Sequence, residues 1–217
     1  DNSAGGQAWA APEGWGPLSG RLFHLSYGKC RALLVLSEEV DGQAQGGVVS
    51  MPWKFSGGAM RGRVNPADRR LYISGLKGWQ TTSPRDGCFE RVRYTGGKVY
   101  LPVALEVKKS GIRMTFSEPL DAESAASPES YGVERWNYRW TKNYGSKDWL
   151  FSDPKKMGRD RMEVLSAKLS PDGRSVFLAI EGLAPVMQMH LRYRLRASDG
   201  KDVRGDIYNT VHKLGAD

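Results

Sequence analysis

The alternation of apolar and polar side chains in the second half of the chain is the feature that most constrains its fold. Between Met189 and Arg196, four apolar residues alternate with one histidine and three arginines. Side chains of a strand point to opposite faces with period two, so this segment is predicted to be a strand with one buried and one wet face. Segments 110–120 and 176–180 follow the same period. Together they indicate antiparallel sheets that cover a core with one face.

Turn signals divide the rest of the chain into short segments of a similar kind. Asp41-Gly42 and Asp199-Gly200 lie between apolar runs, and the Ser-Pro-Asp-Gly sequence at 170–173 favours a hairpin, because proline presets one turn dihedral and glycine accepts a positive one. The 26 glycines and 11 prolines suit short strands joined by turns. The predicted fold class is therefore all-β.

Three regions follow from this pattern. Residues 1–14 lack periodicity and are predicted to be a flexible arm. Residues 15–98 hold four short strands in about forty residues, nearly twice over, which is typical of β-propeller blades. Residues 99–217 hold six or seven strands and are predicted to form an antiparallel β-sandwich. Its segment 131–161 is interpreted as an insertion, too long and polar for a simple hairpin.

Hydrophobic runs, net charge and the two cysteines limit the kinds of protein that this chain can be. No window approaches the roughly 18 apolar residues of a membrane span, so no transmembrane segment is expected. The net charge of +8 permits an acidic partner, although the basic residues are scattered among acidic ones, as on an ordinary solvated surface. Cys30 and Cys88 either form one disulfide or remain two thiols, and neither belongs to a metal motif or to a Cys-x-x-Cys-His haem motif. No cofactor and no metal are expected in this chain.

Several phrases carry a resemblance to a known family. Segments 16–20, 27–30, 60–68, 75–80 and 91–96 resemble the last blades of sorbosone- and glucose-dehydrogenase-like propellers. They are most similar to extracytoplasmic proteins of planctomycetes and verrucomicrobia, which join such a propeller to a c-type cytochrome domain. Segments 137–140 and 143–146 resemble the region that follows the propeller there, and 112–121 with 169–176 resembles bacterial Ig-like modules.

The resemblance implies a periplasmic or secreted protein. It also implies that the remaining propeller blades come from another chain, or that the chain forms a homo-oligomer, because about 85 residues make only about two of the four to eight blades of a closed propeller. The alternative is that the N-terminal part folds as a compact β unit of its own. The first hypothesis is a non-catalytic C-terminal segment that completes a propeller and mediates assembly or ligand binding.

The candidate binding residues are mostly aromatic. If the chain is extended, Trp136, Tyr138 and Trp140 share one face and form a platform on which sugar rings stack, while neighbouring arginines hold sulfate or carboxylate groups. The alternative is that these rings pack in a core. Trp79 and Gln80 either line a propeller mouth or fill an interface. The candidate ligand-binding set is Arg135, Trp136, Tyr138, Arg139, Trp140, Tyr144 and Trp149, with Trp79 and Gln80.

Two further hypotheses belong to other classes. One is a module that binds an acidic polysaccharide through these aromatic residues, whereas nucleic acid is not an expected ligand. The other is a fragment of a quinone-dependent sugar or aldehyde dehydrogenase. No catalytic residue is identified for it, since His24, His190 and His212 are isolated in the sequence. Whether the chain is an enzyme is left open, with a non-enzyme favoured.

Overall fold

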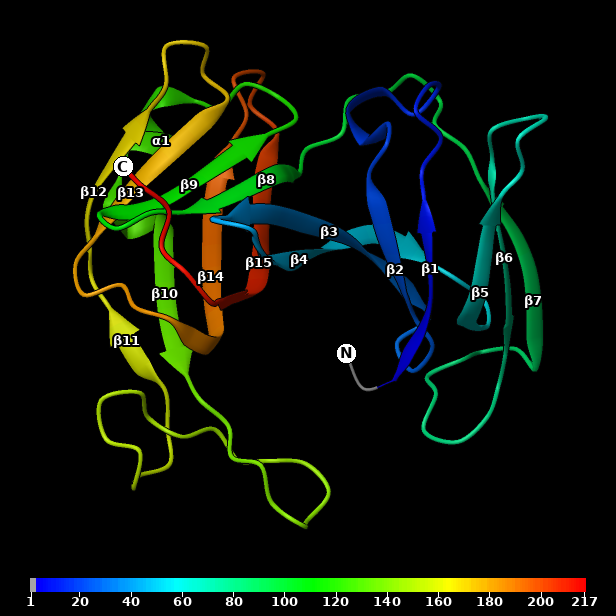
Figure 1. The fold of residues 1–217 in the computed structure, drawn as a ribbon. Helices are drawn as coiled ribbons and strands as arrows, with labels where there is room; N and C mark the ends of the chain where they lie inside the picture. The colour runs from blue at the N-terminus through cyan, green and yellow to red at the C-terminus, as the bar shows by residue number, and fades with distance from the viewer. Residues whose placement is uncertain (1–2) are drawn as a thin grey trace. The chain divides into compact units, whose positions relative to one another are not determined.

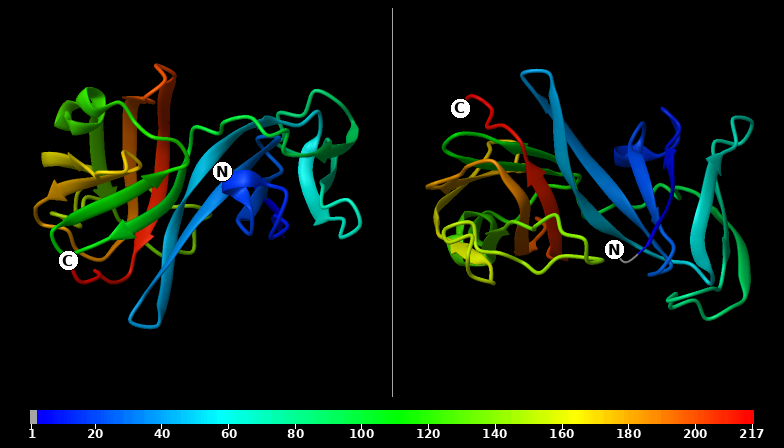
Figure 2. Two further views of the ribbon diagram at one scale, coloured as in Figure 1. Left: turned by 90° about the horizontal axis from the view of Figure 1, so that it is seen from above. Right: turned by 60° about the horizontal axis from the view of Figure 1, so that its bottom comes forward.

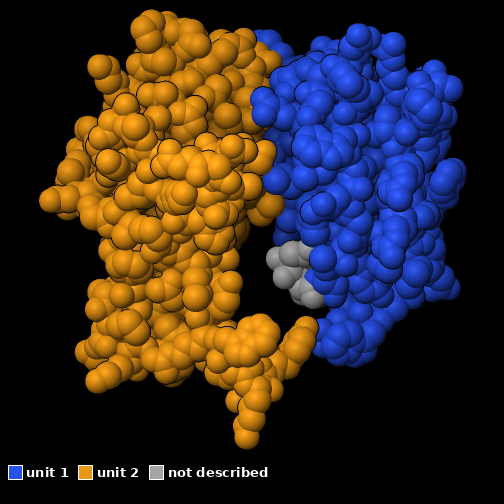
Figure 3. Space-filling view, viewed as in Figure 1, with its two compact units in different colours: residues 1–35, 49–99 blue, residues 36–48, 100–217 orange. Residues whose placement is uncertain are grey.

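The computed structural model describes residues 3–217 and confirms the all-β fold class. Strands make up 53% and helices 5% of the chain, and its antiparallel sheets do not close into a barrel in the described part (Figure 1). The chain forms two compact units. Unit 1 comprises residues 1–35 and 49–99, and unit 2 comprises residues 36–48 and 100–217 (Figure 3). The two units are described separately below.

Unit 1 contains two groups of antiparallel strands. The first, β1-β2-β3-β4, is part of an eight-stranded sheet, and the second, β5-β6-β7, is a sheet of its own. The strands are β1 (Ala4–Trp9), β2 (Leu22–Ser26), β3 (Arg31–Val40), β4 (Gln43–Lys54), β5 (Gly58–Val64), β6 (Leu71–Leu76) and β7 (Gly87–Val92), with a short 3-10 helix η1 (Gly16–Leu18) after β1. Four short strands, nearly twice over, were expected in residues 15–98, but this range contains six strands, β2 to β7, so the expected rhythm is not met.

The flexible arm expected at 1–14 is wrong for Ala4–Trp9, which form strand β1. Gly5 makes this possible. A Cβ on Gly5 would lie 2.2 Å from the carbonyl oxygen of Ala59, so only glycine lets the backbone of β1 approach β5 so closely. A strand held by close backbone approach needs no alternating apolar residues, which is why its sequence gave no signal. Residues 1 and 2 of the expected arm lie outside the described residues.

An aromatic cluster forms the core of unit 1. The Trp15 side chain is only 1% exposed, and its indole Nε1 donates a 2.7 Å hydrogen bond to the Arg69 carbonyl. The rings of Phe23 and Trp53 lie 5.7 and 6.3 Å from it. Leu71 and Ile73 of β6 are fully buried as well.

Unit 2 also contains two sheets, one of order β15-β14-β10-β11 that continues onto β4 and one of order β12-β13-β9-β8. Its elements are β8 (Pro102–Val107), β9 (Gly111–Phe116), the short helix α1 (Ala122–Ala126), the 3-10 helix η2 (Pro128–Ser130), β10 (Tyr131–Trp136), β11 (Asp160–Met162), β12 (Val164–Leu169), β13 (Ser175–Ile180), β14 (Val186–Arg196) and β15 (Asp202–Val211).

The alternating pattern of β14 is confirmed by its burial except at His190, which was expected on the wet face but is only 6% exposed. Met189 and Leu191 are fully buried, while Arg192 and Arg194 of the same strand face solvent. Phe116 of β9 meets Tyr193 of β14 edge-on, with ring centroids 5.5 Å apart. The buried faces of the two sheets therefore pack against each other, as their period of two requires.

The β3–β4 hairpin is the long pair of light-blue strands in Figure 2, and its outer half, residues 36–48, belongs to unit 2. The Glu38 carboxylate accepts hydrogen bonds of 3.1 and 3.2 Å from the backbone N–H of Val107. The buried Gln45 amide accepts hydrogen bonds from the backbone N–H groups of His212 and Lys213. Unit 2 therefore combines residues 36–48 with residues 100–217, and the division of the chain is not simply sequential.

The insertion is shorter than the expected 131–161. Tyr131–Trp136 form β10, which pairs along its whole length with β14, and Asp160–Met162 form β11 on its other side. The segment without regular strands is 137–159, and we refer to it as the aromatic loop.

Candidate functional site

The aromatic loop (residues 137–159) is closed at its base by backbone hydrogen bonds. The N–H of Asn137 and the carbonyl of Trp149 are 2.8 Å apart, and the reverse hydrogen bond from Trp149 to Asn137 has the same length. The side-chain oxygen of Asn137 accepts a 3.0 Å hydrogen bond from the backbone of Met187. The loop therefore leaves β10 in a defined direction.

Three arginines stack on aromatic rings at the base of the aromatic loop. The guanidinium carbon of Arg159 lies 3.9 Å from the ring centroid of Trp136, that of Arg139 lies 3.7 Å from Trp149, and that of Arg135 lies 4.0 Å from Phe151. Arg159 also forms a 2.8 Å ion pair with Asp148. Such cation–π contacts contribute about 0.5–1 kcal/mol each where exposed, and more where desolvated.

The rings that the sequence groups together have different environments. Trp136 is 6% exposed, and Tyr138 is about half exposed. Trp140 and Tyr144 are 99% and 101% exposed, which means that their rings contact almost nothing. Trp136, Tyr138 and Trp140 do not share one exposed platform, because the strand period ends at Trp136 and the chain then turns into the loop.

The part of the loop beyond the stacks, residues 140–147, is called the loop tip. It is closed by a 2.9 Å hydrogen bond from the backbone of Arg139 to the Ser146 hydroxyl, and Gly145 adopts a φ of 81° at its turn. Segment 137–147 contains Arg139, Lys142 and Lys147 and no acidic residue. The tip thus presents two free aromatic rings in a local excess of positive charge.

Asp160, at the start of β11, fixes the second turn of the loop. Partial burial pushes the pKa of Asp160 upward, but hydrogen bonds from the hydroxyl and backbone of Ser152, together with the Arg135 guanidinium, outweigh it and leave the pKa below its ordinary value. The ionised carboxylate is therefore the form that the folded loop prefers.

We expect this turn to loosen in acid. A carboxyl whose pKa is lowered by folding stabilises the fold above its unfolded pKa of about 3.9, and this contribution is lost as the pH falls through the folded value. The protection of the Ser152 amide against hydrogen exchange should fall below about pH 4. The control is Asp160→Asn, which has no titrating group here; an equal fall in that variant would contradict the assignment.

One cluster was missed by the sequence analysis. The His190 imidazole is nearly buried, and its Nε2 lies 2.6 Å from a carboxylate oxygen of Asp206, while its Nδ1 lies 3.8 Å from Glu134. Tyr208 stacks on the ring at 4.4 Å. Pairing of β14 with β15 places Asp206 and Tyr208 beside His190, and pairing of β14 with β10 places Glu134 opposite it. Only the strand register shows this, so nothing local to His190 could have found it.

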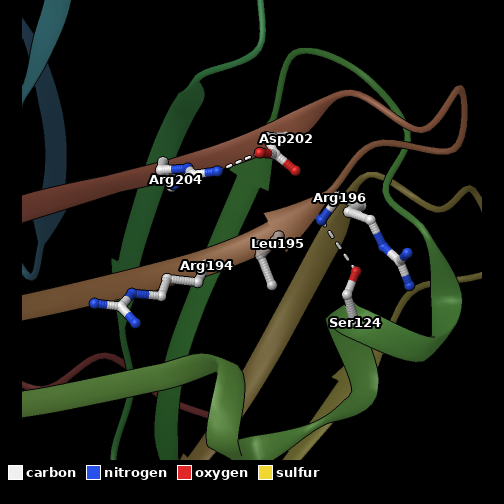
Figure 4. Close-up of a pocket in the computed structure, with 6 residues that line it drawn as sticks. All are labelled: Ser124, Arg194, Leu195, Arg196, Asp202 and Arg204. Carbon is white, nitrogen blue, oxygen red and sulfur yellow. Dashed lines mark hydrogen bonds and ion pairs between the residues drawn. The ribbon is translucent and has the colours of Figure 1, made fainter.

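A hollow of about 260 Å³ lies at one end of β14 and β15, lined by Ser124, Arg194, Leu195, Arg196, Asp202 and Arg204. Figure 4 shows that its arginine side chains point in different directions. Arg204 pairs with Asp202, and Arg196 lies 3.8 Å from Asp121. The guanidinium groups do not converge on one position, so the hollow is not arranged as an anion cradle.

The remaining candidates lie in unit 1. Cys30 and Cys88 are free thiols, and the alternative of two thiols is the one this structure adopts. Burial, together with nearby Glu90, raises the pKa of the Cys88 thiol.

Trp79 is 76% exposed on the loop after β6, and Gln80 beside it is exposed with a φ of 55°.

Among residues 3–217, no three His, Cys, Asp or Glu side chains are grouped so that they could hold a metal ion. Within the same residues, no helix is long and apolar enough to cross a membrane.

Fold and surface together define the class of this protein: an all-β protein of antiparallel sheets that presents exposed aromatic side chains on a positively charged loop. Comparison with known proteins adds no family to this description. No family model, no curated protein and no solved structure matches the chain.

Proposed function

We propose that this chain is a non-catalytic, extracytoplasmic segment that joins further β-structure, as the last blades of a propeller do. The observation that supports this proposal is the open side of the β5-β6-β7 sheet. Strand β7 lies at the end of the strand order and pairs only with β6 among the described residues. An edge strand presents unpaired backbone groups on which another strand can form.

The outer face of this sheet is apolar at its centre. Phe89 of β7 is 76% exposed and stacks on Tyr72 of β6, with centroids 5.8 Å apart. Ser74 of β6 lies opposite Phe89. Leu76, two positions further along β6, is therefore on the same face of the sheet, and it is also exposed. Exposed apolar groups beside an open strand edge are typical of a surface that another polypeptide covers.

The charge of the same face indicates the kind of partner. Arg63 and Arg91 are exposed and lie opposite Tyr72 on its two neighbouring strands. A complementary surface therefore carries carboxylates around an apolar centre. That surface belongs either to a separate chain that supplies blades or to a second copy of this chain.

Native mass spectrometry of the protein, isolated gently from its source, tests this proposal. We expect a mass well above 24.1 kDa, together with slow hydrogen exchange of the amides of β7. The variant Phe89→Ser should dissociate the assembly, because it removes the largest exposed ring of the face.

Leu165→Ser is the matched control, since Leu165 is an exposed apolar residue on β12, the end strand of a sheet in unit 2. It should leave the assembly intact. A protein that remains a single chain at working concentration, or equal effects of the two variants, would refute the proposal.

A further inference from the structure

The loop tip, residues 140–147, has surface chemistry that assembly through β7 does not explain. Trp140 and Tyr144 are 99% and 101% exposed. An indole and a phenol held fully in water leave a large apolar area without a partner. In Figure 1 the aromatic loop extends well beyond the strands of its own sheet.

The base of the loop is held by stacked side chains, whereas its two tip rings have no such contacts. The stacks of Arg139 on Trp149 and of Arg159 on Trp136 fix the base, but an aromatic ring that contacts nothing is free to rotate. A pocket-specific ligand, such as one sugar stacked on one ring face, favours rings whose orientation is already fixed. Partition of the rings into a fluid interface has no such requirement.

The composition of the tip matches one kind of interface. Trp and Tyr accumulate where the headgroups of a bilayer meet its hydrocarbon, because their rings are apolar with one polar group. Arg139, Lys142 and Lys147 accompany them without an acidic residue in segment 137–147. Cations close to an anionic bilayer strengthen binding about fivefold each.

We propose that the loop tip is a peripheral membrane anchor that inserts Trp140 and Tyr144 into the interface of a bilayer with anionic headgroups. Lys142 and Lys147 lie beside the inserted rings and contact the headgroup phosphates. Aromatic insertion and charge attraction are two separate contributions, and stable membrane attachment generally needs two such signals. The attachment is therefore salt-dependent, since ions screen the second contribution.

Sedimentation with vesicles of phosphatidylcholine, with and without phosphatidylglycerol, tests the anchor. The whole chain should bind the vesicles that contain phosphatidylglycerol, and added sodium chloride should weaken this binding. The double variant Trp140→Ala, Tyr144→Ala should lose at least about tenfold in partitioning. Lys142→Glu with Lys147→Glu should lose at least as much, because each reversal replaces attraction by repulsion.

Two controls keep the test specific. Trp79→Ala removes an exposed tryptophan from unit 1, and Lys155→Glu with Lys156→Glu reverses two charges in the loop but outside its tip. Both should bind like the parent chain. Equal losses in tip and control variants would overturn the proposal. So would retention on an alginate or heparin matrix that depends on Trp140 without any vesicle binding, since the tip would then bind an acidic polysaccharide.

Discussion

Replacement of Trp136 by alanine is expected to lower the free energy of unfolding by about 3–5 kcal/mol, the usual range for a buried tryptophan. Its side chain is 6% exposed, at the end of β10. The Arg159 guanidinium, which stacks on this ring and also lies 3.7 Å from Glu134, loses its apolar support. The measurement is urea denaturation followed by circular dichroism.

Trp140→Ala is the matched control, four residues away in the same chain. Its ring is fully exposed, so the change should stay within about 0.5 kcal/mol. Together the two variants separate stability from binding: the first weakens the fold, whereas the second leaves the fold intact and removes a ring from the tip. Similar losses of stability in both would show that the tip packs against the protein.

The second large effect is expected in unit 1. Trp15→Ala should also cost about 3–5 kcal/mol, because it opens a cavity next to Phe23 and Trp53. It further leaves the Arg69 carbonyl without the 2.7 Å hydrogen bond from the indole. Thermal unfolding monitored by circular dichroism measures the loss.

Trp79→Ala is the comparison for Trp15→Ala. Trp79 is 76% exposed on the loop after β6, and its removal should leave the unfolding transition almost unchanged. If Trp79→Ala cost as much as Trp15→Ala, the aromatic cluster around Trp15 would not be the centre of this core.

The sequence predicted best what depends on local period. The alternation from Met189 to Arg196 identified β14 and its buried face, because period two is visible within a few residues. It failed for β1, where Gly5 replaces apolar alternation by close backbone approach to Ala59. The sequence also did not indicate that residues 36–48 group with the C-terminal unit. The contacts that place them there are long-range, since Glu38 binds a backbone group 69 residues away and Gln45 binds one 168 residues away.

The candidate site was predicted by composition but not by geometry. The density of aromatic and basic residues indicated the region of the aromatic loop. Which rings are covered depends on where three arginines stack, and cation–π partners such as Arg159 and Trp136 are 23 positions apart. The environment of His190 was invisible for a related reason: its partner Asp206 belongs to another strand, and only the register of β14 and β15 brings them together.

The β3–β4 hairpin, whose outer half belongs to unit 2, has a consequence for folding during synthesis. The outer half of β3 and β4 is complete at Val48, but its partner β15 ends at Val211. At synthesis rates of about 5–20 residues per second, the edge of β4 therefore remains unpaired for roughly 8–30 s before β15 has been synthesised. Segment 36–48 carries three acidic residues and no basic one. These negative charges keep the unpaired edge solvated and disfavour its pairing with other nascent chains. One of these acidic residues, Glu38, later accepts a hydrogen bond from the backbone of β8.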